Sequence, residues 1–286
     1  MDTQVKASTT PVAGPLPNAL PDPAAVRLSI LDMLYRAKAS HLGSSMSAVE
    51  MLIAMYGSVD VKKIRDREPG RSRVIVSKGH CAAATYATMA HFGVIPMALL
   101  DTYHMNGSHL AGHVSHAVQA VEHSTGALGH GINVAVGCAI GLRSRGIRNA
   151  LSLALVGDGE IQEGSVWEAL MLAAHLRLNN FVALVDNNRI SSITDTDKVL
   201  DMRPLAARFG GLGLAVREVD GHDVAAILAA IRELTAGEQA GVVICNTVKG
   251  KGVPFAENQP IWHYRPLNDE LYAQAKAAIL AAVGGN

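Results

Sequence analysis

The chain has 286 residues, of which 49% are hydrophobic, with a mean hydropathy of +0.19 and no net charge. A chain of this length can bury a large core, as one large α/β domain or two small ones. The balanced charge favours neither nucleic acid nor an anionic membrane as a partner. No apolar run reaches the roughly 18 residues that a membrane span requires.

The cysteines give no sign of a zinc site or of a disulfide framework. Cys81, Cys138 and Cys245 are scattered along the chain without CxxC or CxxH spacing. A reducing compartment suits such a chain, so we expect a cytoplasmic location.

The first 23 residues are rich in proline and lack the apolar core of a signal peptide, which predicts a flexible arm followed by one domain over residues 24–286. Apolar residues at helical spacing predict a helix over 24–39. It ends at a run of serine and glycine, Ser40-His41-Leu42-Gly43-Ser44-Ser45-Met46-Ser47. A strand is predicted over 73–77, and Lys78-Gly79-His80 then opens a helix over 81–91. Small residues before a helix N-terminus favour anion binding by free backbone amides.

Histidine is concentrated in the next segment, since eight of the twelve histidines lie between His80 and His130. A transition-metal site is one interpretation. However, His104, His109, His113, His116, His123 and His130 show no HxxxH pattern with a carboxylate. The preferred interpretation is a polar funnel, and a glycine-punctuated helix over 132–142 follows it.

Two apolar runs form the centre of the chain, and each stops abruptly at polar residues. Residues 151–156 precede Gly157-Asp158-Gly159-Glu160, and residues 181–185 precede Asp186-Asn187-Asn188. An amphipathic helix is predicted between them, over 165–176, which makes the unit a parallel strand pair with a helical crossover. Asp158 and Asn188 then end on neighbouring strand tips. Their oxygens suit Mg2+, and the glycines let a diphosphate approach the backbone.

The remaining segments extend the same α/β pattern. A helix is predicted near 204–209 and a strand over 215–219; Asp220-Gly221-His222-Asp223 caps a helix over 224–234, and a last strand covers 242–245. The predicted fold class is therefore α/β, a single domain with a largely parallel sheet and helices on both faces, holding ligand at the strand tips.

These motifs together resemble the transketolase family of thiamine diphosphate enzymes. Gly157-Asp158-Gly159 followed after 28 residues by Asn188 is similar to the family's GDG...NN signature, and SHLGSS, SKGH, DGHD, TVKGKG and Trp262-His263 are typical of its first domain. The resemblance covers roughly residues 25 to 275. The sequence departs from the family pattern at Leu42, in Gly112-His113-Val114-Ser115, at Ala127 and His130, and at Tyr264.

The resemblance implies a role for particular residues. The metal would be held by Asp158, Asn188 and the backbone oxygen of Ile190. The residues it implies for cofactor binding are His80, Gly126, Ala127, Leu128, Gly159, Glu163, Asn188 and His263. The residues it implies for catalysis, by orienting sugar hydroxyls or moving protons, are His41, His113 and His263.

The family's activity is the transfer of a two-carbon ketol unit from a ketose, phosphorylated in the expected case, to an aldose, with thiamine diphosphate and Mg2+. A complete transketolase continues into two further domains, and the second supplies the glutamate that activates the aminopyrimidine ring. The resemblance therefore implies a split enzyme in which this chain works with a separate C-terminal subunit, in an α2β2 heterotetramer that buries the helix near Gly131 to Leu142. The expected substrates are small sugars, with no nucleic acid and no membrane as partner.

Two alternatives remain open from the residues. The α subunit of a 2-oxo acid dehydrogenase or decarboxylase shares the GDG...NN core, although it needs no histidines facing a sugar, so SHLGSS, SKGH and Trp262-His263 favour transketolase. A non-catalytic cofactor-binding partner derived from this domain is the other, because two of the histidine motifs are altered.

Overall fold

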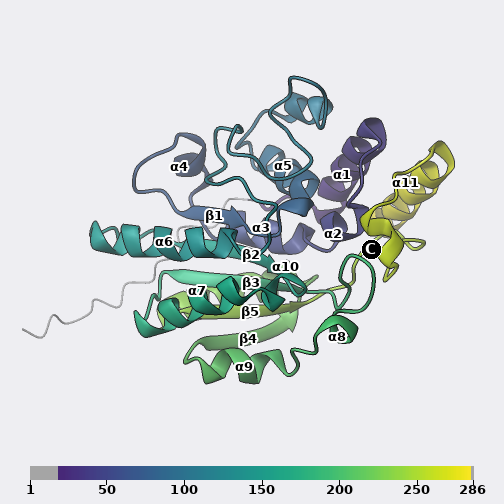
Figure 1. The fold of residues 1–286 in the computed structure, drawn as a ribbon. Coiled ribbons are helices and arrows are strands. Elements are labelled where there is room, and N and C mark those ends of the chain that lie inside the picture. The colour runs from purple at the N-terminus through teal and green to yellow at the C-terminus, as the bar shows by residue number, and fades with distance from the viewer. Residues whose placement is uncertain (1–18, 285–286) are drawn as a thin grey trace, which may run out of the picture.

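The computed structural model describes residues 19–284, so most of the predicted arm over residues 1–23 lies outside the described residues. Five parallel strands form one sheet in the order β1-β2-β3-β5-β4 (Figure 1). The strands are β1 (Arg73–Val76), β2 (Ser152–Gly157), β3 (Phe181–Asn187), β4 (Ala215–Asp220) and β5 (Gly241–Asn246). This architecture confirms the predicted fold class, a parallel sheet within an α/β domain.

Helices cover the sheet and lead into its loops. They are α1 (Pro23–Ala37), α2 (Leu42–Met46), α3 (Val49–Gly57), α4 (Val61–Arg65), α5 (Ala82–His91), α6 (Gly131–Ser144), α7 (Gly164–His175), α8 (Thr196–Val199), α9 (Leu205–Gly211), α10 (Val224–Ala236) and α11 (Asp269–Gly284). Short 3-10 turns are η1 (Gly79–Cys81), η2 (Met97–Thr102), η3 (Glu160–Gln162) and η4 (Pro260–His263). Within residues 19–284, every helix is too short or too polar to cross a membrane.

The strands are apolar on both faces because each face meets a layer of helices. On β2, Leu153 and Leu155 pack into a core with α1, α3, α5 and α10, while Ala154 and Val156 pack into a second core with α6, α7 and α9. Alternate side chains of a strand point to opposite faces, so a strand buried on both sides reads as a continuous apolar run. The burial of all six residues of β2 follows from this arrangement.

Capping residues set the ends of several helices. Asp22 accepts a hydrogen bond from the Ala24 amide at 3.0 Å and so begins α1, and Asp223 does the same for α10 through the Ala226 amide at 3.0 Å. Helix α1 ends two residues before its predicted limit, where Lys38 adopts a left-handed conformation. The predicted capping of α10 by the aspartate of DGHD is confirmed.

The register of the central strands brings the two acidic turns together. Gly157 of β2 lies opposite Asp186 of β3, and the strands are parallel neighbours. Asp158 and Asn188, which follow these positions, therefore emerge at adjacent strand tips, as predicted. The tips face the side of the molecule where α2 and α8 lie (Figure 1).

A long loop between α5 and α6 is laid against the end of β1. Thr125 donates its hydroxyl to the Val76 carbonyl at 2.6 Å, and its amide bonds the Val114 carbonyl at 3.0 Å. A Cβ atom on Gly79 would lie 2.5 Å from the Thr125 backbone, which leaves room only for glycine. This close approach holds residues 125–128 beside the strand tips.

Replacing Gly79 with alanine should therefore destabilise the fold. The added methyl would force the Thr125 backbone away, and overpacking of this kind costs about 1–3 kcal/mol. The matched control is Gly137→Ala in α6, where a Cβ meets nothing within 4 Å, and where alanine should be neutral or stabilising because it favours the helix. Urea unfolding of both variants measures the difference. Equal free energies of unfolding in the two variants would contradict the proposed role of the contact.

Candidate active site

A cavity of about 460 Å³ opens at the carboxyl ends of β1, β2 and β3. Its walls come from α2, the η1 turn, the loop before α6, the turns after β2 and β3, and the segments around Lys249 and His263. The site residues predicted from the sequence that line it are His41, His80, His113, Gly126, Leu128, Asp158, Gly159, Asn188, Ile190 and His263. Residues separated by more than two hundred positions in the chain thus meet at one place.

The three predicted metal ligands lie together in this cavity and are buried. Asp158 accepts hydrogen bonds from the Gly159 amide at 2.8 Å and from the Arg189 amide, and Asn188 Oδ1 accepts from the Ile190 amide at 3.1 Å. A carboxylate or carbonyl oxygen has two lone pairs, so each of these oxygens keeps one for a cation. The backbone bonds aim the oxygens, as supporting contacts do in metal sites.

The charge of Asp158 also fits a bound cation. Burial, and then the nearby Asp186 carboxylate, raise the pKa of the Asp158 carboxyl to about 7. A buried carboxylate with a raised pKa is costly to ionise alone, and a divalent cation would remove that cost. One carboxylate, one amide oxygen and one backbone oxygen are hard ligands that suit Mg2+, which keeps most of its shell for water and phosphate.

Four imidazole rings form the opposite wall of the cavity. The ring centroid of His41 lies 5.0 Å from that of His263, 5.3 Å from that of His113 and 5.8 Å from that of His80. The His41 amide donates to the His263 carbonyl at 3.0 Å, and His41 has a φ of 73°, which is rare for a residue other than glycine. The surrounding structure therefore imposes the orientation of His41.

These imidazoles are neutral at physiological pH. Burial, and then neighbouring His113, lower the pKa of His41 to about 4, while burial followed by Lys249 lowers the pKa of His263 to about 3. Burial also lowers the pKa of His80 and of His113. A neutral imidazole has one donor and one acceptor nitrogen, so each ring can bond a hydroxyl in either direction. The buried Nδ1 atom of His263 has no partner within the described residues and is available to a ligand.

Two lysines and a serine of the cavity were not singled out from the sequence as site residues. Lys78, Lys249 and Ser44 line it, although each belongs to a motif that was quoted. The signal that could have found the lysines is a cation inside a glycine-containing motif beside a predicted anion site. The Lys249 ammonium donates to the Ile190 carbonyl at 2.9 Å and to the Ser191 carbonyl at 2.7 Å. Burial, and then Lys78, lower the pKa of Lys249 to about 8.

Lys78 is paired at the base of the cavity with Asp186. The two side chains form an ion pair with at most 1% exposure, and Asp186 also accepts from the Ser47 hydroxyl at 2.7 Å and from that of Thr247. Burial opposes both charges, but the attraction between them prevails, so the pKa of Lys78 is raised and that of Asp186 is lowered. Lys249 therefore remains the cation whose charge has no carboxylate bonded to it in the described residues of the cavity wall.

Two predicted cofactor residues do not line the cavity. Ala127 lies between Gly126 and Leu128 and is exposed. Glu163 precedes α7 as an exposed residue and lies beside Gly129 instead. The geometry of this single chain therefore gives neither side chain a contact with the cavity.

The histidine-rich segment does not form the predicted funnel as a whole. Of its eight histidines, His80 and His113 line the cavity. His109 lines a separate groove beside η2, and His116 bonds the Ser124 hydroxyl at 2.6 Å. Within residues 19–284, no cluster of three or more His, Cys, Asp or Glu side chains is arranged to hold a metal ion. A site built on Asp158 needs only one such side chain, since its companions are an amide and a backbone oxygen.

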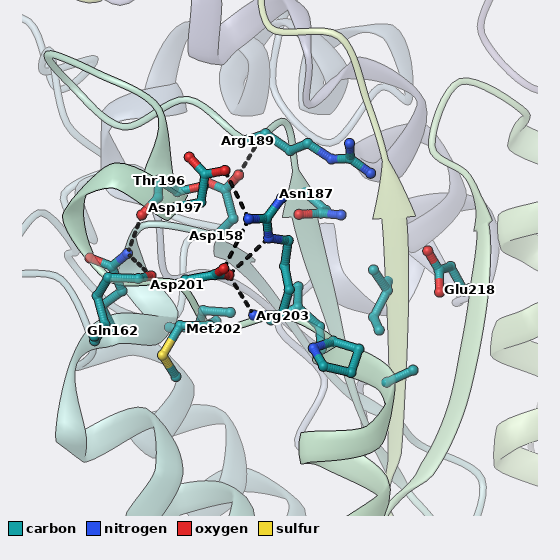
Figure 2. Close-up of a pocket in the computed structure, with 16 residues that line it drawn as sticks. Asp158, Gln162, Asn187, Arg189, Thr196, Asp197, Asp201, Met202, Arg203 and Glu218 are labelled. Atoms are coloured by element: carbon teal, nitrogen blue, oxygen red, sulfur yellow. Dashed lines mark hydrogen bonds and ion pairs between the residues drawn. The ribbon is translucent and has the colours of Figure 1, made fainter.

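The loop after β3 is fastened to the turn after β2. Figure 2 shows Gln162 reaching this loop, where its amide donates to the Thr196 and Leu200 carbonyls at 3.1 Å each. Arg203 pairs with Asp197 at 3.0 Å and with Asp201 at 2.8 Å in the same view. These contacts hold the loop that carries the Ile190 carbonyl next to Asp158. The predicted difference of this loop from the family pattern remains a prediction.

Comparison with known proteins identifies the family. The model of the family "Transketolase, thiamine diphosphate binding domain" matches residues 23–280. One of the two kinds of apulose-4-phosphate transketolase chain, from Actinobacillus succinogenes, is 38% identical over 234 residues, which are 81% of this chain and 84% of that protein. A 6-deoxy-6-sulfo-D-fructose transketolase subunit of Clostridium sp. is 32% identical over 259 residues, 89% of this chain and 93% of that protein.

Solved structures agree with this assignment. A transketolase of Pichia stipitis aligns with a TM-score of 0.82 at 28% identity, over 90% of this chain. The chain spans only 40% of the length of that transketolase. It therefore belongs to the transketolase family of transferases and corresponds to the family's thiamine diphosphate binding domain.

Proposed function

We propose that the chain is the amino-terminal subunit of a split transketolase that uses thiamine diphosphate and Mg2+ to transfer a two-carbon ketol unit from a phosphorylated ketose to an aldose. The observation that carries the proposal is the cavity itself. It combines the oxygen ligands around Asp158 with four neutral imidazoles and the Lys249 ammonium. Its donors therefore suit a metal-bound diphosphate on one side and sugar hydroxyls on the other.

In this proposal Asp158, Asn188 and the Ile190 carbonyl hold Mg2+, and the metal bridges to the cofactor diphosphate. Gly159 offers its backbone beside the metal, since a Cβ there would meet only the distant Ser191 and Thr196 side chains. Lys249 adds a positive charge near the phosphates. A diphosphate carries several negative charges, so a divalent ion and an ammonium in a buried cavity neutralise it effectively.

Four further residues or segments would bind the rest of the cofactor. His80 and the backbone of Gly126 to Leu128 face the cavity at the end of β1, opposite the metal ligands. Glu163, exposed at the start of α7, would act across a subunit interface that a single chain does not contain. When bound, thiamine diphosphate supplies the nucleophilic carbon that takes up the two-carbon unit.

The imidazoles would position the sugar and move its protons. His41 and His263 stand edge to face, with an interplanar angle of 83°, and His113 stands edge to face on the other side of His41 at 77°. Rings set at such angles direct their nitrogens along different axes, so several hydroxyls of one polyol can be bonded at once. Neutral imidazoles can also accept or donate a proton near neutral pH.

The rest of the enzyme would be a separate subunit. The relatives from Actinobacillus succinogenes and Clostridium sp. are named as transketolase subunits, and this chain covers most of each. Their names specify ketoses that carry a phosphate or a sulfonate, which supports an anionic sugar as substrate here. The partner would supply the glutamate that activates the aminopyrimidine, in a cytoplasmic α2β2 assembly. In this proposal residues 1–23 are the arm and 24–286 the cofactor-binding domain.

The partner interface would include α6 and α7. Met171 and Leu172 of α7 are exposed, and Gly137 and Gly141 of α6 have nothing within 4 Å of an added Cβ. An apolar, glycine-punctuated face of this kind suits close packing against another protein chain. A 2-oxo acid dehydrogenase or decarboxylase is not favoured, because the relatives described above are transketolases.

Replacing His263 with alanine should lower turnover by about 100-fold or more, the usual contribution of a positioned acid or base. Mg2+ affinity should stay near the parent value, since imidazole is a poor magnesium ligand. The control is His175→Ala at the exposed end of α7. Steady-state kinetics with the partner present give the comparison, and turnover of His263→Ala equal to that of the control at all donor concentrations would remove His263 from the catalytic residues.

The proposed function is tested by reconstitution. The chain is mixed with a protein that carries the two remaining transketolase domains, together with thiamine diphosphate and Mg2+, and phosphorylated ketoses are screened against aldoses by mass spectrometry. Products that differ from the substrates by a two-carbon transfer are expected from the mixture, and the chain alone should be inactive because the pyrimidine-activating carboxylic acid is missing. Robust donor cleavage by the chain alone would contradict the split enzyme.

A further inference from the structure

We propose that His222, together with Arg27 and Glu50, is a positioning unit that sets where the Lys249 ammonium lies in the cavity. The inference rests on the proposed cofactor site. None of these three residues lines the cavity. They join α1, α3 and the turn after β4 to the loop of residues 247–252 that carries Lys249.

The unit is built on a buried ion pair. Arg27 Nη1 lies 2.7 Å from Glu50 Oε1, and Arg27 Nη2 lies 2.9 Å from Glu50 Oε2, so the contact is bidentate. The Arg27 side chain also reaches the Met46 carbonyl at 3.4 Å. Both residues are buried, with exposures of 7% and 4%. A bidentate pair fixes the direction of the carboxylate as well as its position.

His222 connects this carboxylate to the main chain of the loop. Its Nδ1 lies 3.1 Å from Glu50 Oε2, and its Nε2 accepts a hydrogen bond from the Val248 amide at 2.8 Å. A backbone amide can only donate, so Nε2 carries no proton, and in the neutral ring the proton is on Nδ1, directed to Glu50. The ring thus acts as a rigid spacer of fixed tautomer between Glu50 and Val248.

The same arginine holds the other end of the loop. Arg27 Nε donates to the Lys251 carbonyl at 3.1 Å, and a Cβ on Gly252 would lie 3.2 Å from the Arg27 side chain. Val248 and Lys251 flank Lys249 in the sequence, so both attachments act on the segment from which the lysine extends. A third bond, from the Gly250 amide to the Gly43 carbonyl at 2.9 Å, fastens the loop to α2.

The consequence for the cavity follows from the position of Lys249 between these attachments. Its side chain leaves the loop toward the metal side and ends at the Ile190 and Ser191 carbonyls. The interaction of a buried ammonium with a phosphate depends strongly on their separation, because the local dielectric is low. Loss of the His222 acceptor would free the Val248 amide and let the loop, and with it the ammonium, move away from the ligand.

A double-mutant cycle separates positioning from general stability. The variants are His222→Asn, whose shorter side chain keeps a donor for Glu50 but loses the acceptor for Val248, Lys249→Met, and the two combined. The dissociation constant of thiamine diphosphate is measured by calorimetry in Mg2+ with the partner chain present. Each single variant should weaken binding by about tenfold, as loss of supporting contacts does in cofactor and metal sites. The double variant should bind no more weakly than Lys249→Met.

Additive losses in the double variant, or parent-like binding by His222→Asn, would overturn the proposal. His222→Gln, which can place an acceptor near the Nε2 position, should restore most of the affinity, and His175→Asn on the exposed end of α7 is the matched control. A rescue that fails would also count against the Val248 bond as the acting contact.

Hydrogen exchange keeps the inference independent of the cofactor assignment. His222→Asn should speed amide exchange in residues 247–252 while β3 exchanges as in the parent, whether or not thiamine diphosphate binds. If the parent fails to bind thiamine diphosphate, the proposed function is wrong, and the exchange result alone then decides whether His222 holds the loop. Unchanged exchange in residues 247–252 would overturn the positioning unit.

Discussion

The buried ion pair between Lys78 and Asp186 is the interaction on which the cavity depends. Asp186 is fully buried at the end of β3, and it is bonded by Lys78 after β1, by Ser47 after α2 and by Thr247 after β5. Removing one partner of such a pair leaves an unpaired buried charge, which costs about 3–5 kcal/mol. The pair therefore holds four segments of the chain together at the carboxyl edge of the sheet, and it gives Asp158 a charged neighbour that raises its pKa.

The charges of the cavity follow from which groups are already satisfied. The charge of Lys78 is balanced by Asp186, and Glu160 is occupied by the Ser77 hydroxyl and by the Gly129 and Gly157 amides. Burial keeps the histidines neutral. What remains is Lys249 and the lone pairs around Asp158, so one side of the cavity favours a cation and the adjoining side favours an anion. A metal-bound diphosphate has both features, and the wall of neutral imidazoles suits a polyol.

Sequence reasoning succeeded where the signal was local. Apolar runs that stop at acidic residues located β2, β3 and the turn with Asp158, because a parallel strand buried on both faces leaves that pattern. It failed for α3, since residues of that helix are buried all round and show no amphipathic period. It also missed Lys249 and the link between His222 and Glu50, which depend on contacts between residues far apart in the chain, 172 positions in the case of His222 and Glu50.

Magnesium-dependent binding of thiamine diphosphate tests the account most directly. Calorimetry on the chain with its partner compares the parent with Asp158→Ala, in Mg2+ and in EDTA, with Glu168→Ala on the exposed face of α7 as the control. Loss of a direct ligand should exceed the roughly 10- to 100-fold effect typical of supporting contacts, so Asp158→Ala should weaken binding by at least about 100-fold, to the level of the parent in EDTA. Binding by Asp158→Ala as tight as that of the parent, or binding by the parent that EDTA leaves unchanged, would contradict the assignment of this cavity as the metal and cofactor site.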